Sequence, residues 1–167
     1  MQDNIIVKPS VEKQFDRFLR QGRVLFFSAP CGFGKTAVAE ALLSSREVLR
    51  LPADSVGSKL PSAEADWQIL LLDDLQDMQE EQDWNALCEL IRACPERRFV
   101  LLSRGTPPGS LMAFQYTGLM MVLEADDLLF DADDVRRLLR LYGVEAADSE
   151  IDGILKESVG YPLGVAI

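Results

Sequence analysis

The segment APCGFGKT at positions 29–36 constrains the fold of this chain more than any other feature. It follows the apolar run 24–28 (VLFFS), which is typical of a buried parallel strand. It precedes an Ala- and Leu-rich stretch that predicts a helix from Lys35 to about Ser44. Strand, glycine-rich loop and helix in this order are the context of the phosphate-binding motif G-x-x-x-x-G-K-[ST], the P-loop. The alternative is a glycine-rich turn before a helix by coincidence, and the strand together with G-K-T argues against it.

The residue types in this loop suit the binding of phosphate groups. Backbone N–H groups of the loop and the N-terminus of the following helix bind phosphate oxygens. Gly32 and Gly34 permit backbone angles and a close approach that a Cβ atom would obstruct. Lys35 reaches the β- and γ-phosphates, and the Thr36 hydroxyl is a ligand for Mg²⁺.

The first glycine of the motif is replaced by Ala29. Alanine is the smallest replacement for glycine and can begin the loop if its φ is negative, while Pro30 stiffens the turn. We therefore do not read the substitution as damage to the site. Cys31 lies inside the loop beside Lys35, where it is either a small loop residue or a redox switch.

Composition bounds the remaining possibilities. The 167 residues are 48% hydrophobic, which indicates one globular domain, or one domain with a small appendage. The net charge of −10 disfavours direct DNA or RNA binding unless a local basic groove exists. The absence of histidine excludes His-based triads and His metal ligands, and the three cysteines have no zinc spacing. No signal peptide or transmembrane span is visible, which predicts a cytoplasmic protein without a membrane partner.

Strands and helices alternate up to residue 124, and helices alone follow. Strands are predicted at 24–28, 47–51, 69–72, 99–103 and 120–123, helices at 9–22, 35–44 and 83–94, and mainly loop at 54–66. This alternation is typical of a doubly wound parallel sheet. Asp131 is expected to cap a helix that ends at Gly143, and Ser149 another that runs towards Gly160. We expect a P-loop core at residues 1–124 and the start of a helical lid at 125–167.

Two further strand ends carry polar residues. The strand at 69–72 ends in Asp73-Asp74, and Asp73 is expected to hold the metal together with Thr36. Asp74 could orient or deprotonate the attacking water, which makes it a candidate catalytic residue. Arg104, after the strand at 99–103, could fork two oxygens of the γ-phosphate if its strand lies between the other two. The alternatives are a solvated acidic turn and an ordinary arginine at a strand end.

Taken in order, these motifs resemble the signal-transducing STAND NTPases, above all the nucleotide-binding domain of MalT-type regulators of the LuxR class. The family patterns are A-P-x-G-x-G-K-T, paired aspartates, S/T-R-x-x-P-P, L-x-x-x-D-L-x-F-x-x-x-E and G-[YWL]-P-L. Here they stand at 29–36, 73–74, 103–108, 123–134 and 160–163. Lys8-Pro9 resembles an R-P element that lies near the adenine in this class. The resemblance covers nearly the whole chain.

The resemblance implies a three-layer α/β sandwich of the ASCE/AAA-like P-loop NTPase type, with parallel strand order 2-3-4-1-5 and a C-terminal helical appendage. It implies ATP or ADP with Mg²⁺, self-association of the full-length protein in the ATP state, and slow hydrolysis as a reset. It also implies that Pro162 packs near the adenine. The nucleotide-binding residues expected are Lys8, Pro9, Pro30, Cys31, Gly32, Phe33, Gly34, Lys35, Thr36, Ala37, Arg104 and Pro162.

The chain departs from the family in two respects. The segment between Thr36 and Leu70 is much shorter than usual, so one or two peripheral elements are expected to be missing. The inducer-binding repeats and the DNA-binding helix-turn-helix of the family are not found, so DNA contact is expected only through a domain outside this chain. The apolar ending LGVAI favours a piece of a longer protein over a natural C-terminus docked in the core.

Three functions fit these residues. The first is an ATP-binding, slowly hydrolysing regulatory domain of a larger switch protein. The second is a stand-alone small P-loop kinase, or another P-loop ATPase, with residues 125–160 as its lid. Against a kinase, Arg136, Arg137 and Arg140 follow helical periodicity, and paired aspartates suit water activation. The third is a module that binds nucleotide and hydrolyses nothing.

Overall fold

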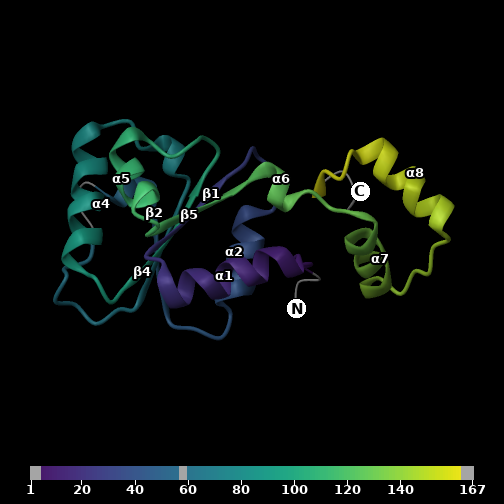
Figure 1. The fold of residues 1–167 in the computed structure, drawn as a ribbon, viewed down its shortest axis with the longest axis horizontal. Helices are drawn as coiled ribbons and strands as arrows, with labels where there is room; N and C mark the ends of the chain where they lie inside the picture. Colours follow the sequence, from purple (N-terminus) through teal and green to yellow (C-terminus); the bar gives the residue numbers. More distant parts are fainter. Residues whose placement is uncertain (1–4, 57–59, 163–167) are drawn as a thin grey trace.

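Five parallel strands form one sheet in the order β2-β3-β4-β1-β5 (Figure 1). The computed structural model describes residues 5–56 and 60–162. The strands are β1 (Val24–Ser28), β2 (Val48–Pro52), β3 (Ile69–Asp73), β4 (Arg98–Ser103) and β5 (Met120–Glu124). The expected strand order is confirmed, and β4 lies between β1 and β3 as the proposed role of Arg104 requires.

Helices cover both faces of this sheet and extend beyond one end of it (Figure 1). The α-helices are α1 (Pro9–Gln21), α2 (Lys35–Leu43), α4 (Glu81–Ala93), α5 (Met112–Tyr116), α6 (Ala125–Leu128), α7 (Ala132–Leu141) and α8 (Asp148–Ser158). Short 3-10 helices are η1 (Ala53–Ser55), η2 (Leu75–Asp77) and η3 (Gly109–Leu111). Helices α7 and α8 lie at the end of the elongated molecule that is far from α4.

The apolar strands alternate their side chains between two separate cores. On one face, Phe26 and Leu101 pack in a cluster with residues of α4, η3 and α5. On the other face, Phe27 and Leu102 pack with residues of α1 and α2. Successive side chains of a strand point to opposite faces of its sheet, so a continuous apolar run is needed where both faces are covered. The predicted three-layer sandwich is confirmed.

The helices after the sheet begin close to the predicted positions, with one correction. Asp131 caps α7, because its carboxylate accepts a hydrogen bond from the Asp134 N–H at 3.0 Å. The predicted cap of α8, Ser149, is wrong, since the helix begins at Asp148 with Ala147 as its N-cap. The Glu150 carboxylate accepts from the Ala147 N–H at 2.8 Å, and this acid therefore sets the start of the helix.

The helical segment is held against the residues that precede α1. The Lys8 ammonium donates to the Leu129 carbonyl and lies 3.6 Å from the carboxylate of Asp134, which is almost fully buried. Arg137 donates to the Val7 carbonyl at 3.2 Å. These contacts connect α7, and Leu129 at the end of α6, to the segment that precedes α1.

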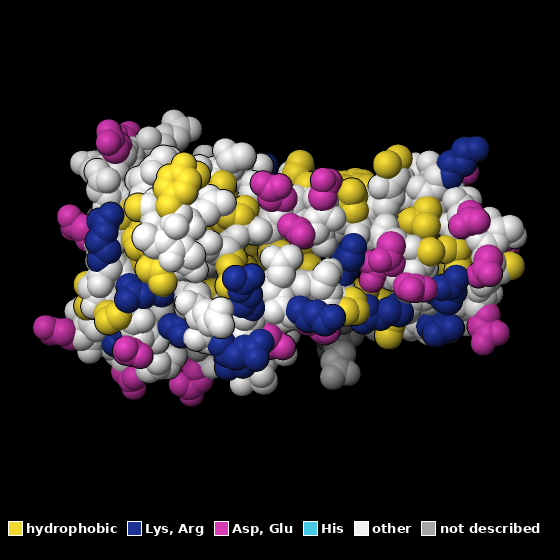
Figure 2. Space-filling view, viewed as in Figure 1, with side chains coloured by type: hydrophobic (Ala, Val, Ile, Leu, Met, Phe, Trp, Pro, Cys, Tyr) yellow, Lys and Arg dark blue, Asp and Glu magenta, His cyan; other side chains and the backbone are white. Residues whose placement is uncertain are grey.

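The surface mixes charges of both signs. Figure 2 shows Lys and Arg side chains gathered along one edge of the face in view, across both the sheet region and the helical region. Acidic side chains lie on either side of them. In the described part of the chain, no helix combines the length and apolar character needed to cross a membrane.

Candidate nucleotide-binding site

The loop between β1 and α2 has a backbone that its residue types permit. Gly32 and Gly34 have φ of +84° and +73°, in the left-handed region that glycine adopts without strain. Ala29 has a negative φ, because Asp74 and Val159 are the described non-glycine residues with a positive one. The Ala29 side chain is 1% exposed and packs in the core on the α1 and α2 face. Alanine at this position therefore adds a core contact and leaves the loop geometry intact.

Lys35 spans the loop from the first residue of α2. Its ammonium donates to the carbonyl oxygens of Ala29 at 2.6 Å and Pro30 at 3.0 Å. Burial lowers the pKa of Lys35, and the nearby Asp73 and Cys31 act in the opposite direction. The ammonium thus stands above the loop, where an anion cradled by the loop amides would meet it.

Thr36 and Asp73 bring two oxygen atoms together at the end of the sheet. The Thr36 hydroxyl donates to Asp73 Oδ2 at 2.8 Å, and Asp73 Oδ1 accepts from the Asp74 N–H at 2.7 Å. A hydroxyl and a carboxylate are the oxygen donors that suit Mg²⁺, which keeps several water ligands and needs few from the protein. This donor pair fits such an ion.

Asp74 and Arg104 face each other across the ends of β3 and β4. Asp74 has φ +57° and ψ +37°, a left-handed conformation that aspartate tolerates better than most residues. Its Oδ1 lies 3.8 Å from Arg104 Nη2, and both side chains are more than half exposed. A cavity of about 290 Å³ joins them to the loop, and we call it the polar cavity for its charged and hydroxyl side chains. It is lined by Cys31, Gly32, Gly34, Lys35, Thr36, Ala37, Asp73, Asp74 and Arg104.

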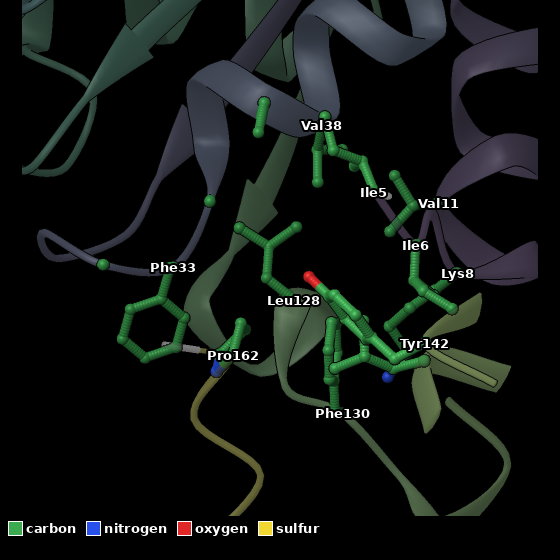
Figure 3. A pocket seen from close by; sticks show the side chains of 14 residues that line it. Ile5, Ile6, Lys8, Val11, Phe33, Val38, Leu128, Phe130, Tyr142 and Pro162 are labelled. Atoms are coloured by element: carbon green, nitrogen blue, oxygen red, sulfur yellow. The ribbon is translucent and has the colours of Figure 1, made fainter. Parts of the chain in front are cut away.

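An apolar cavity of about 300 Å³, shown in Figure 3, adjoins the polar one. The two cavities share Gly32, Gly34 and Ala37. The rest of its lining comes from Ile5, Ile6, Lys8, Val11, Phe33, Val38, Leu128, Phe130, Leu138, Tyr142 and Pro162. In Figure 3 the Tyr142 hydroxyl points into this cavity. An apolar chamber and a polar chamber joined over one glycine-rich loop suit a molecule with a flat base and a phosphate chain.

The end of the helical segment reaches back to the loop. The Tyr161 hydroxyl donates to the Cys31 carbonyl at 2.9 Å, and the Tyr161 ring lies 5.1 Å from that of Phe33, centre to centre. Gly160, with φ +73°, allows this return, because a Cβ atom there would lie 2.5 Å from the Phe130 carbonyl oxygen. The next residue, Pro162, lines the apolar cavity.

The structure brings most of the predicted site residues to these two cavities. Lys8, Phe33 and Pro162 line the apolar cavity, while the metal and catalytic candidates line the polar one. Pro9 and Pro30 are not among the described residues that line either cavity; Pro9 begins α1, and Pro30 offers its carbonyl to Lys35. Leu163, the last residue of the G-[YWL]-P-L match, lies outside the described residues.

Sequence reasoning did not assign Gln76 or Tyr142 to the site. Gln76 hydrogen-bonds both Asp74 and the backbone of Arg104, and Tyr142 presents its hydroxyl to the apolar cavity. A glutamine after two aspartates carries no signal of its own. Tyr142 stands next to the predicted helix stop Gly143, and only the folded structure shows that it lines the apolar cavity.

Known proteins resemble this chain in fold and hardly in sequence. No protein-family model matches the sequence, and the search of curated proteins found no match. Solved structures do match. The Holliday junction branch migration motor RuvB of Thermotoga maritima is 18% identical, with a TM-score of 0.64 over 96% of this chain. The chain has the fold of a P-loop NTPase.

Two further solved structures share this P-loop NTPase fold. A STAND protein with a tetratricopeptide repeat sensor, from Pyrococcus horikoshii, has a TM-score of 0.64 at 12% identity over 96% of this chain, and this chain covers 29% of it. A Walker-type ATPase from Pyrococcus abyssi has a TM-score of 0.64 at 11% identity over 98% of this chain, and this chain covers 67% of it. This chain spans 59% of the RuvB chain.

Proposed function

We propose that this chain is the ATP-binding, slowly hydrolysing switch domain of a larger signal-transducing transcription regulator. Residues 1–124 are the nucleotide-binding core in this proposal, and 125–167 begin a helical lid. The hydrogen bond from Tyr161 to the Cys31 carbonyl carries the proposal, because it connects the lid directly to the loop that would hold the phosphates. This contact gives a change of nucleotide at the loop a direct route to the lid, which is the coupling that a switch requires.

Each polar residue of the site has one part in this proposal. The loop amides and Lys35 bind the phosphates of ATP, and ADP binds the same groups in the resting state. Thr36 and Asp73 would hold Mg²⁺, and the ion would supply positive charge to stabilise the β- and γ-phosphates. Asp74 accepts a proton from the attacking water, and Arg104 forks oxygens of the terminal phosphate. Water attacks the γ-phosphorus, the bond to the bridging oxygen breaks, and ADP and phosphate leave.

The regulatory part of the proposal rests on the resemblance to MalT-type STAND proteins. The ordered motifs support it, and so does the shared fold with the tetratricopeptide-repeat STAND protein. On this basis we propose self-association in the ATP state of the full-length protein, and DNA contact only through a domain outside this chain.

The arginines of the lid bear on the kinase alternative. Small P-loop kinases bring lid arginines to the phosphates, whereas here two of the three lid arginines, Arg136 and Arg137, have acidic partners within the lid. Arg136 lies 2.6 Å from Asp133 and 2.9 Å from Asp148, and Arg137 pairs with Asp134. Neither arginine is among the described residues that line the polar cavity. These contacts favour a lid that responds to the bound nucleotide over a lid that takes part in phosphate transfer.

Isothermal titration calorimetry with ATP and with ADP, each with Mg²⁺, tests nucleotide binding. Lys35→Ala removes two or more charge-assisted hydrogen bonds to phosphate and is expected to weaken binding about a hundredfold or more. Lys13→Ala, the same change at an exposed lysine on α1, is the matched control and is expected to leave affinity unchanged. Equal affinity of Lys35→Ala and the wild type would remove the assigned site.

Hydrolysis is tested separately, as release of phosphate from ATP without any acceptor. A slow release that Asp74→Asn reduces at least tenfold supports a water-activating role. Turnover unchanged in Asp74→Asn would show that this carboxylate is not catalytic. Binding without turnover in the wild type would favour the non-hydrolysing module.

A further inference from the structure

Gln76 occupies a fixed place at the edge of the polar cavity, although it does not line it. It belongs to η2, which begins directly after the left-handed turn at Asp74. The preceding residue, Leu75, is fully buried in the core on the α4 face and anchors this short helix. Gln76 itself is half-buried. Packing of Leu75 therefore holds the backbone of this short helix in place. The Gln76 side chain can then hydrogen-bond residues at the ends of β3 and β4.

The side-chain amide of Gln76 makes two hydrogen bonds that join β3 to β4. Its Nε2 donates to Asp74 Oδ1 at 2.8 Å, and its Oε1 accepts from the Arg104 backbone N–H at 3.1 Å. The paired register of these two strands ends at Leu72 and Leu101. The amide thus bridges the strands beyond the last pair of the sheet, where the catalytic candidates stand.

On its other side, the end of β4 is hydrogen-bonded to the end of β1. The Ser28 hydroxyl donates to the Gly105 carbonyl at 3.0 Å, and the Gly105 N–H donates to the hydroxyl of Ser103 at 3.1 Å. The Ala29 N–H donates to the Ser103 carbonyl at 3.3 Å. The backbone on both sides of Arg104 is therefore held, by the P-loop strand on one side and by Gln76 on the other.

We propose that Gln76 is a positioning residue that sets Asp74 and Arg104 as a pair, so that the arginine reads the terminal phosphate of the nucleotide. Its donor group hydrogen-bonds Asp74 Oδ1, and among the described residues none hydrogen-bonds Asp74 Oδ2, which leaves that oxygen for the water. Its acceptor group fixes the backbone from which the Arg104 side chain extends. The ion pair between Asp74 and Arg104 is exposed, so it contributes little to stability and cannot by itself hold the two side chains in place. This inference rests on the proposed function.

The consequence is a difference between ATP and ADP. Arg104 contributes to binding only where a third phosphate is present, so loss of its positioning should weaken ATP and spare ADP. Gln76→Leu, of similar size and without hydrogen-bonding groups, is expected to weaken ATP binding about tenfold and ADP binding less than about twofold. Gln76→Ser, polar but too short to reach both partners, is expected to do the same. Gln79→Leu, an exposed glutamine beyond η2, is the control.

Calorimetry on the four proteins of a double-mutant cycle tests the coupling. The variants are Gln76→Leu, Arg104→Ala and the two combined. If Gln76 acts through Arg104, the double variant binds ATP as weakly as Arg104→Ala alone. Additive losses, equal losses for ATP and ADP, or wild-type affinity in both Gln76 variants would overturn the inference. Wild-type protein that binds neither nucleotide would overturn the proposed function and this inference together, an outcome distinct from those three.

Discussion

Gly160 offers the sharpest test of the contact between lid and loop. It has φ +73°, and an added Cβ atom would lie 2.5 Å from the Phe130 carbonyl oxygen, a backbone atom that no side-chain rotation can move away. The Gly160 carbonyl also accepts the Phe130 N–H at 2.8 Å. Gly160→Ala must therefore push the two backbone segments apart, and Tyr161 with them.

The expected loss of stability has two parts. A left-handed conformation costs a residue with a Cβ atom about 1–2 kcal/mol. Loss of the Phe130–Gly160 hydrogen bond adds about 0.5–1.5 kcal/mol. We expect the free energy of unfolding to fall by about 1.5–3.5 kcal/mol, equivalent to about 3–14 °C in Tm for a domain of this length. ATP affinity should fall several-fold, because Tyr161 and Pro162 leave the loop and the apolar cavity.

Urea denaturation followed by circular dichroism measures the first effect, and calorimetry with ATP and Mg²⁺ the second. Gly153→Ala is the matched control, since it lies in α8 with no atom within 4 Å of an added Cβ. That change should stabilise the protein by about 0.5–1 kcal/mol, because alanine favours a helix interior. If Gly160→Ala is as stable as the wild type and binds ATP equally well, the proposed docking of the lid on the loop is refuted.

Two further predictions concern the loop alanine and the cap of α7. Ala29→Gly should lower the free energy of unfolding by about 1–1.5 kcal/mol, because a buried methyl group is lost and the unfolded chain gains conformational freedom. ATP affinity should stay within about twofold. An unchanged urea midpoint would contradict this prediction. Asp131→Ala should cost about 1 kcal/mol at pH 7. The backbone N–H of Asp134 holds the pKa of Asp131 below its usual value, so this stabilisation exists above about pH 4 and disappears as pH falls through the lowered pKa. A deficit that is equal at about pH 7 and pH 2.5 in urea titrations would disprove it.

The elements with strong local patterns were predictable from residue order. All five strands were predicted. For β1, β3 and β4 the signal is a continuous apolar run, which a strand covered on both faces needs, whereas β2 contains Arg50 and lies at the edge of the sheet. The short helices η3, α5 and α6 were not predicted, since segments of three to five residues have no periodicity to detect. The cap of α8 was misplaced at Ser149 because Glu150, one residue later, supplies the capping hydrogen bond.

The sequence alone determined the phosphate loop, the pair of aspartates at the end of β3 and the layered α/β architecture, because each is encoded within a short stretch of chain. Only the tertiary structure decided how distant residues meet. Tyr161 and Cys31 are 130 positions apart, and Gln76 and Arg104 are 28 apart. No periodicity spans such distances, so the lid contact, the apolar cavity and the amide bridge emerge only when the sheet sets the strand ends side by side.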